Sequence, residues 1–172
     1  RDVLFLMQDM REFELYGTVG AITCCLDSVN YLTGDGELDK CLSLVHNYLD
    51  PDGLFLFDIN TPHKFENVYA SNNYVYEEDD CGNDSFCVWQ NFYDKETKIC
   101  EFSLTVFERE EGNDTYSRRD EVQCERCYSK NEIESTLQKN KFELIGFYSD
   151  FNFTPAKDTD ERWYIVARAK KD

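Results

Sequence analysis

Three short apolar runs near the start of the chain each end in polar or acidic side chains. They are residues 4–7, followed by Gln8-Asp9-Met10; residues 21–25, followed by Leu26-Asp27-Ser28; and residues 54–57, followed by Asp58-Ile59-Asn60. Continuous apolar runs, unlike alternating ones, are typical of strands buried on both faces, as in a parallel sheet between helices. Ligands of such sheets bind beyond the carboxyl ends of the strands. The pattern therefore predicts parallel strands whose terminal polar residues lie at a ligand site.

A helix is predicted between the second and third runs, over residues 37–49. Its apolar positions recur at helical spacing and mark one face: Leu38, Cys41, Leu42, Val45, Tyr48 and Leu49. Asp35 is the expected N-cap, and Pro51 and Gly53 prevent the helix from continuing past Asp50. We therefore expect a strand, helix, strand unit over residues 19–60, with parallel strands and a right-handed crossover.

The pattern changes to alternation between residues 74 and 124. Apolar positions 100, 102, 104 and 106 interleave with polar positions 101, 103 and 105, and residues 86–93 also have the composition of a strand. Residues 94–97 and 111–114 have the composition of turns. The sequence thus predicts three or four antiparallel strands, which form a small sheet inserted into the parallel fold.

The last part of the chain predicts one helix and two strands. Ser129 and Glu132 form a capping box that opens a helix to about residue 140, with Ile133 and Leu137 facing inward. Residues 142–148 and 162–169 have strand character and are separated by the polar residues 150–161. We expect these two strands to form an antiparallel pair at one edge of the sheet.

Length, composition and charge favour one soluble domain. The chain has 172 residues, of which 41% are apolar and 15% aromatic, enough for a substantial core. Its formal net charge of −17 opposes binding to phosphate backbones, so we expect no nucleic-acid partner. No apolar stretch approaches the roughly 18–20 residues of a membrane span, and residues 1–3 do not resemble a signal peptide. We therefore expect no membrane partner and a cytoplasmic location.

Eight cysteines leave two further interpretations open. Together with sequons at residues 83–85, 113–115 and 152–154, they are compatible with a secreted, disulfide-bonded domain. A chain of this length does not need disulfides, however, and Cys24, Cys25, Cys41 and Cys100 occupy core-like positions, which favours reduced, buried thiols. Cys124 and Cys127 are spaced as zinc ligands, with Cys81 and Cys87 as candidate partners. Because the spacing of that second pair does not fit a zinc ribbon or finger, we expect no metal.

Several of these segments, in this order, resemble the class I S-adenosylmethionine-dependent methyltransferases. They are the strand end at residues 8–11, the segment 24–31, the turn 49–53 that leads into 55–60, and the terminal strand pair. The chain is most similar to small bacterial members that carry an inserted antiparallel sheet after the fifth strand. The resemblance covers essentially the whole chain and begins at the family's third strand. It implies an α/β fold: a Rossmann-like methyltransferase sheet with a parallel core and an antiparallel C-terminal strand pair, truncated at the N-terminus, plus an inserted antiparallel β subdomain.

The resemblance divides the chain into three parts. Residues 1–62 correspond to the C-terminal part of the parallel cofactor-binding sheet, residues 63–125 to the inserted substrate-lid subdomain, and residues 126–172 to the final helix and strand pair. Two family features have no counterpart in the sequence: the Gly-rich loop after the first strand and the acidic residue that ends the second. The Gly34-Asp35-Gly36 segment precedes a helix and fits a turn. We therefore expect a methyltransferase fragment or a degenerate domain, which by itself binds the cofactor poorly.

The resemblance implies five cofactor-binding residues. Asp9 and Met10 match the positions that meet the adenine of S-adenosylmethionine, and a carboxylate is a suitable acceptor for an exocyclic amine. Cys25, Leu26 and Asp27 match the segment beside the methionine part and the reacting methyl group. The alternative interpretation is that Asp9 caps the following turn and that Asp27 is the N-cap of a short helix.

Candidate substrate-binding residues lie at the strand ends and on the inserted sheet: Asn30, Tyr31, Asp58, Asn60, Trp89 and Arg126. Tyr31 is suited to be an aromatic wall near a cationic centre. On the inserted sheet, Trp89 shares a face with Asn91 and Tyr93, and we expect Arg126 at its far end together with Arg118, Arg119 and Tyr128. The alternative is that these residues form cross-strand pairs and surface salt bridges. No catalytic residue is assigned, because methyl transfer mainly needs alignment of the reactants and exclusion of water.

The predicted function is S-adenosylmethionine-dependent methyl transfer to a small-molecule acceptor. A non-catalytic remnant or protein-interaction module is the first alternative, because half of the cofactor site is missing. A nucleotide-dependent oxidoreductase is the second, although its glycine fingerprint is equally absent. The methyltransferase interpretation requires Asp9, Leu26 and Asp58 to lie along one rim of a parallel sheet.

Overall fold

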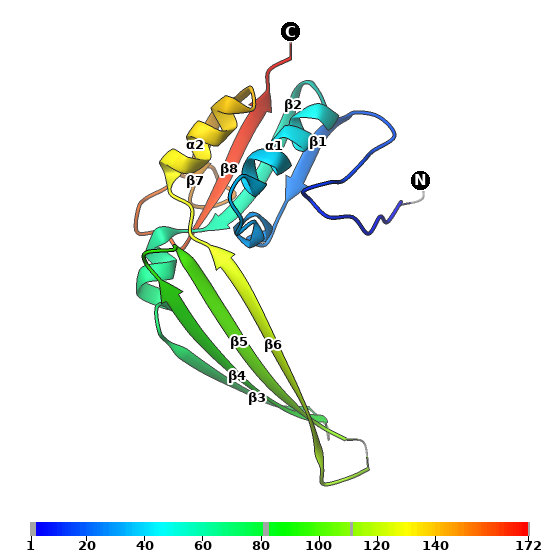
Figure 1. Ribbon diagram of the computed structural model, residues 1–172, viewed down its shortest axis with the longest axis vertical. Helices are drawn as coiled ribbons and strands as arrows, with labels where there is room; N and C mark the ends of the chain where they lie inside the picture. The colour runs from blue at the N-terminus through cyan, green and yellow to red at the C-terminus, as the bar shows by residue number, and fades with distance from the viewer. Residues whose placement is uncertain (1–2, 81–82, 111, 172) are drawn as a thin grey trace.

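The computed structural model describes residues 3–80, 83–110 and 112–171, which form two four-stranded sheets (Figure 1). The first sheet has the order β1-β2-β8-β7 and consists of β1 (Val19–Cys24), β2 (Leu49–Asn60), β8 (Arg162–Ala169) and β7 (Phe142–Tyr148). β1 and β2 are parallel, whereas β8 is antiparallel to both β2 and β7. The predicted parallel unit and the predicted antiparallel pair at one sheet edge are confirmed.

Helix α1 (Glu37–Tyr48) connects β1 to β2, close to the predicted bounds. The predicted N-cap was wrong, because Gly36 and not Asp35 precedes the first helical residue. Gly36 has φ 80, a left-handed conformation that glycine adopts at little cost, so the turn itself sets the start of the helix. Asp35 instead pairs with Arg126.

Helices α1 and α2 (Lys130–Lys139) cover one face of the first sheet (Figure 1). The predicted capping box is present, with the Ser129 hydroxyl accepting from the backbone of Glu132 and the Glu132 carboxylate accepting from the backbone of Ser129. Ile133 and Leu137 are fully buried, as predicted, against core residues of the sheet such as Phe55. Among the described residues, the helices are all too short or too polar to cross a membrane.

The predicted strand at residues 4–7 was wrong. In the described part of the chain these residues pair with no strand, and their side chains are exposed, Phe5 to 88%. In a doubly wound sheet, two other strands separate the third strand in sequence from the fourth. The described residues provide no such strands beside β1, so the segment has no neighbour with which to form ladder hydrogen bonds.

The same edge explains why β1 is more exposed than predicted. Its burial pattern is largely exposed, although its sequence is a continuous apolar run. Within the described residues β1 pairs only with β2, and the sheet face turned away from α1 and α2 carries no helix. Burial on both faces, which the apolar run predicts, needs partners on that edge and that face.

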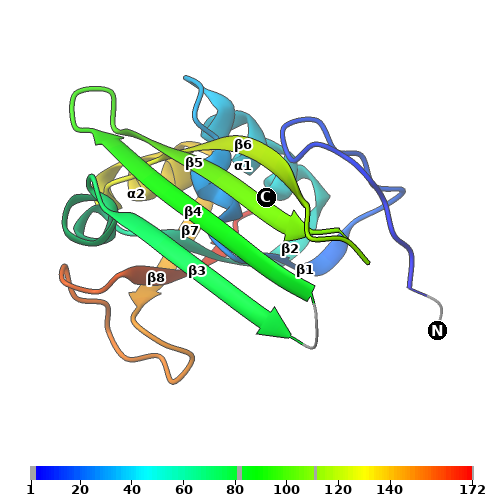
Figure 2. The ribbon, with the colours of Figure 1, turned by 90° about the horizontal axis from the view of Figure 1, so that it is seen from below.

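The predicted antiparallel sheet is confirmed, with the order β3-β4-β5-β6. It consists of β3 (Asn73–Asp80), β4 (Asn83–Asp94), β5 (Ile99–Arg109) and β6 (Tyr116–Arg126). Figure 1 shows these strands extending away from the first sheet as a long arm, and Figure 2 shows them side by side in one layer. Two short helices, η1 (Ser28–Tyr31) and η2 (Lys64–Tyr69), lie where the two sheets meet: η1 contacts β2 and β6, and η2 contacts β4.

Candidate functional site

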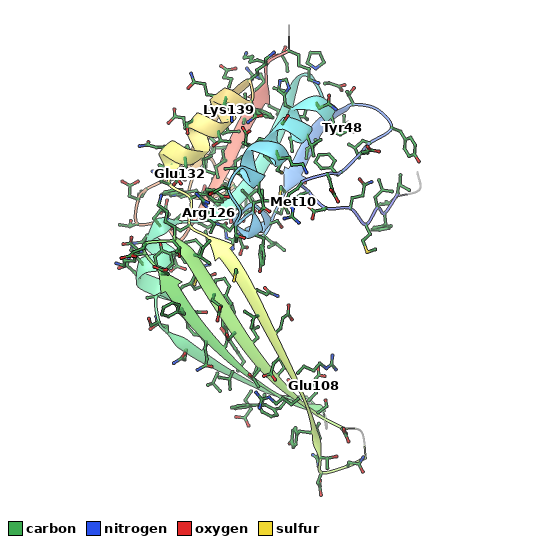
Figure 3. All side chains as sticks on the ribbon, in the orientation of Figure 1. Met10, Tyr48, Glu108, Arg126, Glu132 and Lys139 are labelled. Atoms are coloured by element: carbon green, nitrogen blue, oxygen red, sulfur yellow. The ribbon has the colours of Figure 1, made fainter. Side chains whose placement is uncertain are left out.

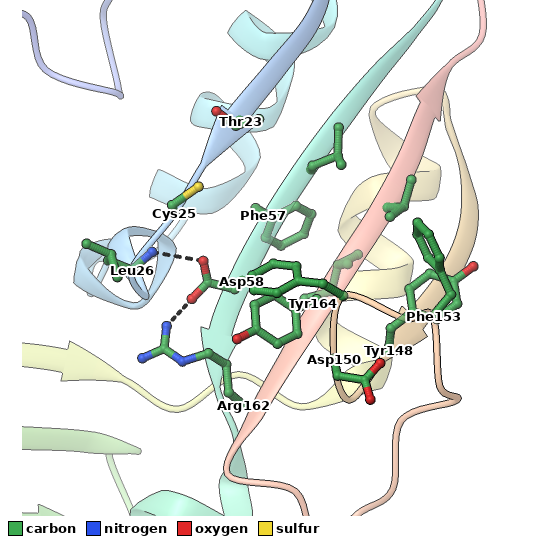
Figure 4. Close-up of a pocket in the computed structure, with 14 residues that line it drawn as sticks. Thr23, Cys25, Leu26, Phe57, Asp58, Tyr148, Asp150, Phe153, Arg162 and Tyr164 are labelled. Carbon is green, nitrogen blue, oxygen red and sulfur yellow. Dashed lines mark hydrogen bonds and ion pairs between the residues drawn. The ribbon is translucent and has the colours of Figure 1, made fainter.

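The carboxyl ends of β1 and β2 meet at a short turn that Asp58 holds in place. The Asp58 carboxylate accepts a hydrogen bond from the backbone N–H of Leu26 at 2.8 Å (Figure 4). It accepts another from the backbone N–H of Asp27 at 3.0 Å. Both turn residues have positive φ values, 57 and 51. This conformation is unfavourable for residues other than glycine, so the buried carboxylate compensates for the strain of the turn. Leu26 and Asp58 therefore lie together on one rim, which is part of the predicted arrangement; Asp9, the third predicted residue, does not end a strand of this sheet.

Asp9 has a different environment from the one expected. Its carboxylate accepts from the backbone N–H of Arg11 at 2.8 Å and from the Arg11 guanidinium, which also pairs with Glu37 at the start of α1. These bonds to Arg11 lower the pKa of Asp9 to about 2. Asp9 thus caps its own turn, which is the alternative interpretation of this residue, and its contact with adenine stays a prediction.

Six polar residues form a partly buried network at the junction of the two sheets, here called the junction cluster: Asp27, Asp58, Asn60, Lys64, Glu125 and Arg162. Asn60 is at its centre, because its amide nitrogen donates to Asp27 and to Glu125, each at 2.8 Å. The amide oxygen of Asn60 accepts from Lys64 at 3.0 Å. Arg162 pairs with Asp58 and, at 2.9 Å, with Asp27. The cluster therefore links the ends of β2 and β6 with the start of β8.

Burial changes the ionisation of the cluster. It raises the pKa of Glu125 to about 8, and the Asp27 carboxylate acts in the same direction, while the bond from Asn60 opposes both. Burial also lowers the pKa of Lys64, with a further contribution from Arg162. Burial alone would lower the pKa of Arg162, but its two carboxylate partners raise it. The cluster thus contains one carboxyl group that can carry a proton near neutral pH.

Two predicted substrate residues on η1 have different surroundings. Asn30 is fully buried: its amide oxygen accepts from the backbone of Asn60 at 2.9 Å, and its amide nitrogen donates to the backbone of Arg126 at 2.9 Å. Asn30 therefore holds η1 to the ends of β2 and β6. Tyr31 is partly exposed, and its hydroxyl donates to the side chain of Gln123 on β6 at 2.7 Å.

The two predicted residues on the antiparallel sheet also differ from each other. Trp89 belongs to a group of aromatic rings with Tyr69, Tyr74, Tyr76 and Phe102. Arg126 lies at the end of β6 nearest the first sheet, where it contacts Asp35 at 3.2 Å and its guanidinium lies over the ring of Tyr128 (Figure 3).

The expected grouping of four basic and aromatic residues at one end of the sheet was wrong. Arg118 and Arg119 lie at the start of β6, where Arg119 pairs with Glu108, and Figure 3 places Glu108 far from Arg126. Arg126 and Tyr128 instead follow the opposite end of the strand. The strand is long enough that its two ends reach different parts of the molecule.

A cavity of about 300 Å³ borders the junction cluster on the sheet face turned away from the helices (Figure 4). Leu26, Asp58 and Arg162 line the end nearest the cluster. The rest is mostly aromatic and apolar, with side chains from β2, β7, β8 and the loop between β7 and β8: Leu56, Tyr148, Phe151, Phe153, Tyr164 and Val166. Cys25, another predicted cofactor residue, also lines it.

Several residues of this region were not found from the sequence. Glu125 and Arg162 have no local signal, because each lies far along the chain from its partner. Lys64 lies only four residues from its partner Asn60, but no motif marks it. The aromatic residues Phe151 and Phe153 had one available signal, since they interrupt a mostly polar segment of the sequence. In the structure both side chains are exposed and line the cavity.

The rim fits part of S-adenosylmethionine. The side chain of Leu26 is 78% exposed and Cys25 is exposed, so they offer apolar and polarisable contacts suited to the carbon chain next to a sulfonium centre. The backbone N–H groups of Leu26 and Asp27 are already bonded to Asp58. In the part of the chain that the structure describes, no glycine-rich turn directly follows β1 or β2. These residues therefore provide no glycine loop that could hold the ribose or the amino acid end of S-adenosylmethionine.

The described cysteines are free thiols, and burial raises the pKa of Cys24 to about 11 and that of Cys41 to about 12. Cys81, one of the residues considered for zinc, lies outside the described residues. Within those residues, no group of histidine, cysteine and acidic side chains has the geometry to hold a metal ion.

Comparison with known proteins finds methyltransferases among the similar sequences and structures. The chain is 30% identical over 172 residues to the protein named "Putative methyltransferase YqeM" of Bacillus subtilis (strain 168), an alignment that covers 98% of this chain and 66% of that protein. A crystal structure of an S-adenosylmethionine-dependent methyltransferase from Clostridium acetobutylicum ATCC 824 has a TM-score of 0.84 and 27% identity, over 95% of this chain and 63% of the other. The chain thus spans slightly less than two thirds of the length of these relatives. No family model matches it.

A more distant structure has the same fold. CalS10, described as an amino pentose methyltransferase from Micromonospora echinaspora, has a TM-score of 0.73 at 16% identity, over 95% of this chain and 63% of that one. Neither the oxidoreductase nor the remnant alternative gains support from these similarities. On this evidence, the chain is similar in sequence and in fold to S-adenosylmethionine-dependent methyltransferases.

Proposed function

We propose that this chain is part of an enzyme that transfers a methyl group from S-adenosylmethionine to a small-molecule acceptor. The observation that carries the proposal is the turn at Leu26 and Asp27, fixed by Asp58 at the carboxyl ends of two parallel strands. Ligands of α/β sheets bind at this edge. Because the chain spans less than two thirds of its relatives, the proposal concerns the full-length gene product.

The cofactor supplies an electrophilic methyl group on a sulfonium centre, and the residues of this chain position it. We assign Cys25, Leu26 and Asp27 to its methionine end, because Cys25 and Leu26 line the cavity and Asp27 joins the rim to the junction cluster. Asp9 and Met10 are assigned to the adenine. Asp9 can accept a further hydrogen bond beside its bonds to Arg11, since a carboxylate has about four acceptor sites.

The proposed substrate residues divide by what they contact. Tyr31 and Trp89, which are both accessible in part, are assigned direct contact with the acceptor. The other four are largely occupied with contacts inside the protein, and we assign them to positioning the rim and the lid: Asn30, Asp58, Asn60 and Arg126. The acceptor would lie between the rim and the antiparallel sheet, with residues 63–125 as the lid.

We also propose how the chain divides into domains and where in the cell the protein is located. Residues 1–62 and 126–172 form the cofactor-binding core in this proposal, because both contribute strands to the first sheet. Free thiols among the described cysteines support a bacterial cytoplasmic location, where thiols stay reduced.

Isothermal titration calorimetry of the full-length gene product with S-adenosylmethionine tests the function. Replacing the exposed Leu26 by Asp should weaken binding by about tenfold or more, because a carboxylate replaces the apolar contact without disturbing the core. The matched control is Val122→Asp, at an exposed position on the far sheet. Absence of binding to the unmodified protein, or equal affinity of the Leu26 and Val122 variants, would contradict the proposal.

A further inference from the structure

A carboxylate from the turn after β1, Asp27, and one from β6, Glu125, meet at the amide group of Asn60. One N–H of this amide donates to Asp27 and the other to Glu125. Glu125 is only 3% exposed, whereas the side chain of Asp27 retains 18% of its exposure. Two acidic groups so close together cannot both ionise at low cost unless a cation or a proton is shared between them.

The charges of the junction cluster do not balance. Asp27, Asp58 and Glu125 can contribute three negative charges, whereas Lys64 and Arg162 contribute two positive charges. Burial of an uncompensated charge is costly, so the cluster has room for one additional positive charge. A proton on Glu125 supplies that charge when no ligand is bound, which agrees with the raised pKa of this residue.

Unpaired polar groups on the same sheet face indicate that a ligand completes the site. The register places Glu125, Cys100 and Tyr93 in one row, and Gln123, Phe102 and Asn91 in the adjacent row. Asn91 is 5% exposed, yet among the residues that the structure describes neither its amide oxygen nor its amide nitrogen has a hydrogen-bond partner, and the indole nitrogen of Trp89 also lacks one there. Unpaired buried donors and acceptors cost stability, so their presence on the lid face points to a polar ligand there.

We infer that the methyl acceptor is an amine, that Asp27 and Glu125 bind it as the ammonium, and that Glu125 takes up its proton. The inference rests on the proposed function and names the substrate class of that same site. In the proton step an N–H bond of the ammonium breaks, its electron pair stays on nitrogen, and the proton forms an O–H bond on Glu125. The free electron pair is what a nucleophile for methyl transfer requires.

The groups around Glu125 favour this exchange. Asp27 precedes η1, Asn60 ends β2, Lys64 and Tyr69 lie on η2, and Cys100 lies on β5. Burial raises the pKa of Cys100 to about 12, and burial also raises the pKa of Tyr69, so both stay neutral near pH 7. Burial also raises the pKa of Tyr31 on η1, and Glu125 acts in the same direction. These three neighbours therefore keep their protons near pH 7, whereas Glu125, with a pKa of about 8, can accept and release one in the neutral range.

Calorimetry with benzylamine and benzyl alcohol, which differ by the amine, tests the inference without the methyl donor. Benzylamine is the cation at neutral pH, and its ring suits the aromatic group around Trp89. Titrations at pH 7 in two buffers of different ionisation enthalpy report how many protons are released on binding. We expect benzylamine to bind the chain at least about tenfold more tightly than the alcohol. Binding of the ammonium should also release the proton that Glu125 carries in the free chain, up to about one proton per benzylamine.

Glu125→Gln should lose both the preference for the amine and the proton release. Glu121→Gln is the matched control, because Glu121 is exposed and lies on the same face of the same strand. A carbon-13 NMR titration of the Glu125 carboxyl in the unmodified chain provides a readout that needs no variant: benzylamine should lower the pKa of this group. No binding of benzylamine at millimolar concentration, equal binding of amine and alcohol, or binding without proton release would overturn the inference. Binding of S-adenosylmethionine is measured separately, so failure of the proposed function and failure of the amine assignment are distinguishable.

Discussion

Replacing Asp58 by Asn removes the charge that organises the rim while keeping the shape of the side chain. The carboxylate accepts from the N–H groups of Leu26 at 2.8 Å and Asp27 at 3.0 Å, and it pairs with Arg162. An asparagine has one acceptor oxygen, and its NH₂ group is a donor. At least one donor of the rim would therefore face another donor in the variant.

The expected loss of stability follows from these three bonds. A hydrogen bond to a charged group contributes about 1.5–3 kcal/mol, and a neutral one about 1 kcal/mol. Asparagine retains one neutral bond, and Arg162 keeps its second partner, Asp27, at 2.9 Å. We therefore expect the free energy of unfolding to fall by about 3 kcal/mol, a large share of the roughly 5–15 kcal/mol that stabilises a typical domain.

Urea denaturation measures the loss, with the fluorescence of the buried Trp163 as the signal. The control is Asp52→Asn on the same strand, an exposed position with φ 60 that asparagine tolerates, for which we expect a change within about 0.5 kcal/mol. Amide hydrogen exchange at Leu26 and Asp27 should also become faster in the Asp58 variant. The reasoning is refuted if Asp58→Asn matches the control and the exchange of these two amides is unchanged.

Three further predictions concern protonation and packing. Burial is the main cause that raises the pKa of Glu125 from 4.5 to about 8, so the native state binds a proton here that the unfolded chain has already lost. The free energy of unfolding, measured by denaturation, should therefore fall between about pH 5 and 8, by roughly 1 kcal/mol per pH unit. Glu125→Gln should remove this fall. Ser129→Ala should cost about 1 kcal/mol by removing the capping box, whereas Ser135→Ala at an exposed position of the same helix should cost less; equal losses in urea denaturation would count against the cap. Leu137→Ala should cost about 2–5 kcal/mol because it leaves a cavity under α2, and a change in melting temperature no larger than that of Ser135→Ala would contradict this packing.

Elements with a periodic pattern were predicted well because their signal is local. Helix α1 and helix α2 each show a 3.6-residue apolar face, and the capping box at Ser129 fixes where α2 begins. The four antiparallel strands show alternation and turn residues, which need no knowledge of distant parts of the chain. The parallel orientation of β1 and β2 followed from the helix between them.

Residues 4–7 show the limit of the same reasoning. Their composition is that of a buried strand, yet a strand exists only where a neighbour supplies the ladder hydrogen bonds. In the described residues, that neighbour is absent from the edge of β1, and the segment is exposed. Apolar composition thus shows that a segment can form a buried strand, but the strand forms only where the sheet provides a neighbouring strand to pair with it.

The junction cluster could be predicted only in part, because half of it depends on register. Asp27, Asp58 and Asn60 follow apolar runs, so the rule about strand ends finds them. Glu125 is 65 residues from Asn60, and Arg162 is 104 residues from Asp58. Arg162 reaches the rim because β8 pairs antiparallel to β2, with Arg162 opposite Asn60. Glu125 reaches it because β6 ends where η1 and η2 join the two sheets. The chemistry we assign to this site therefore arises from the antiparallel sheet meeting the rim, and a sequence pattern within either part alone does not contain it.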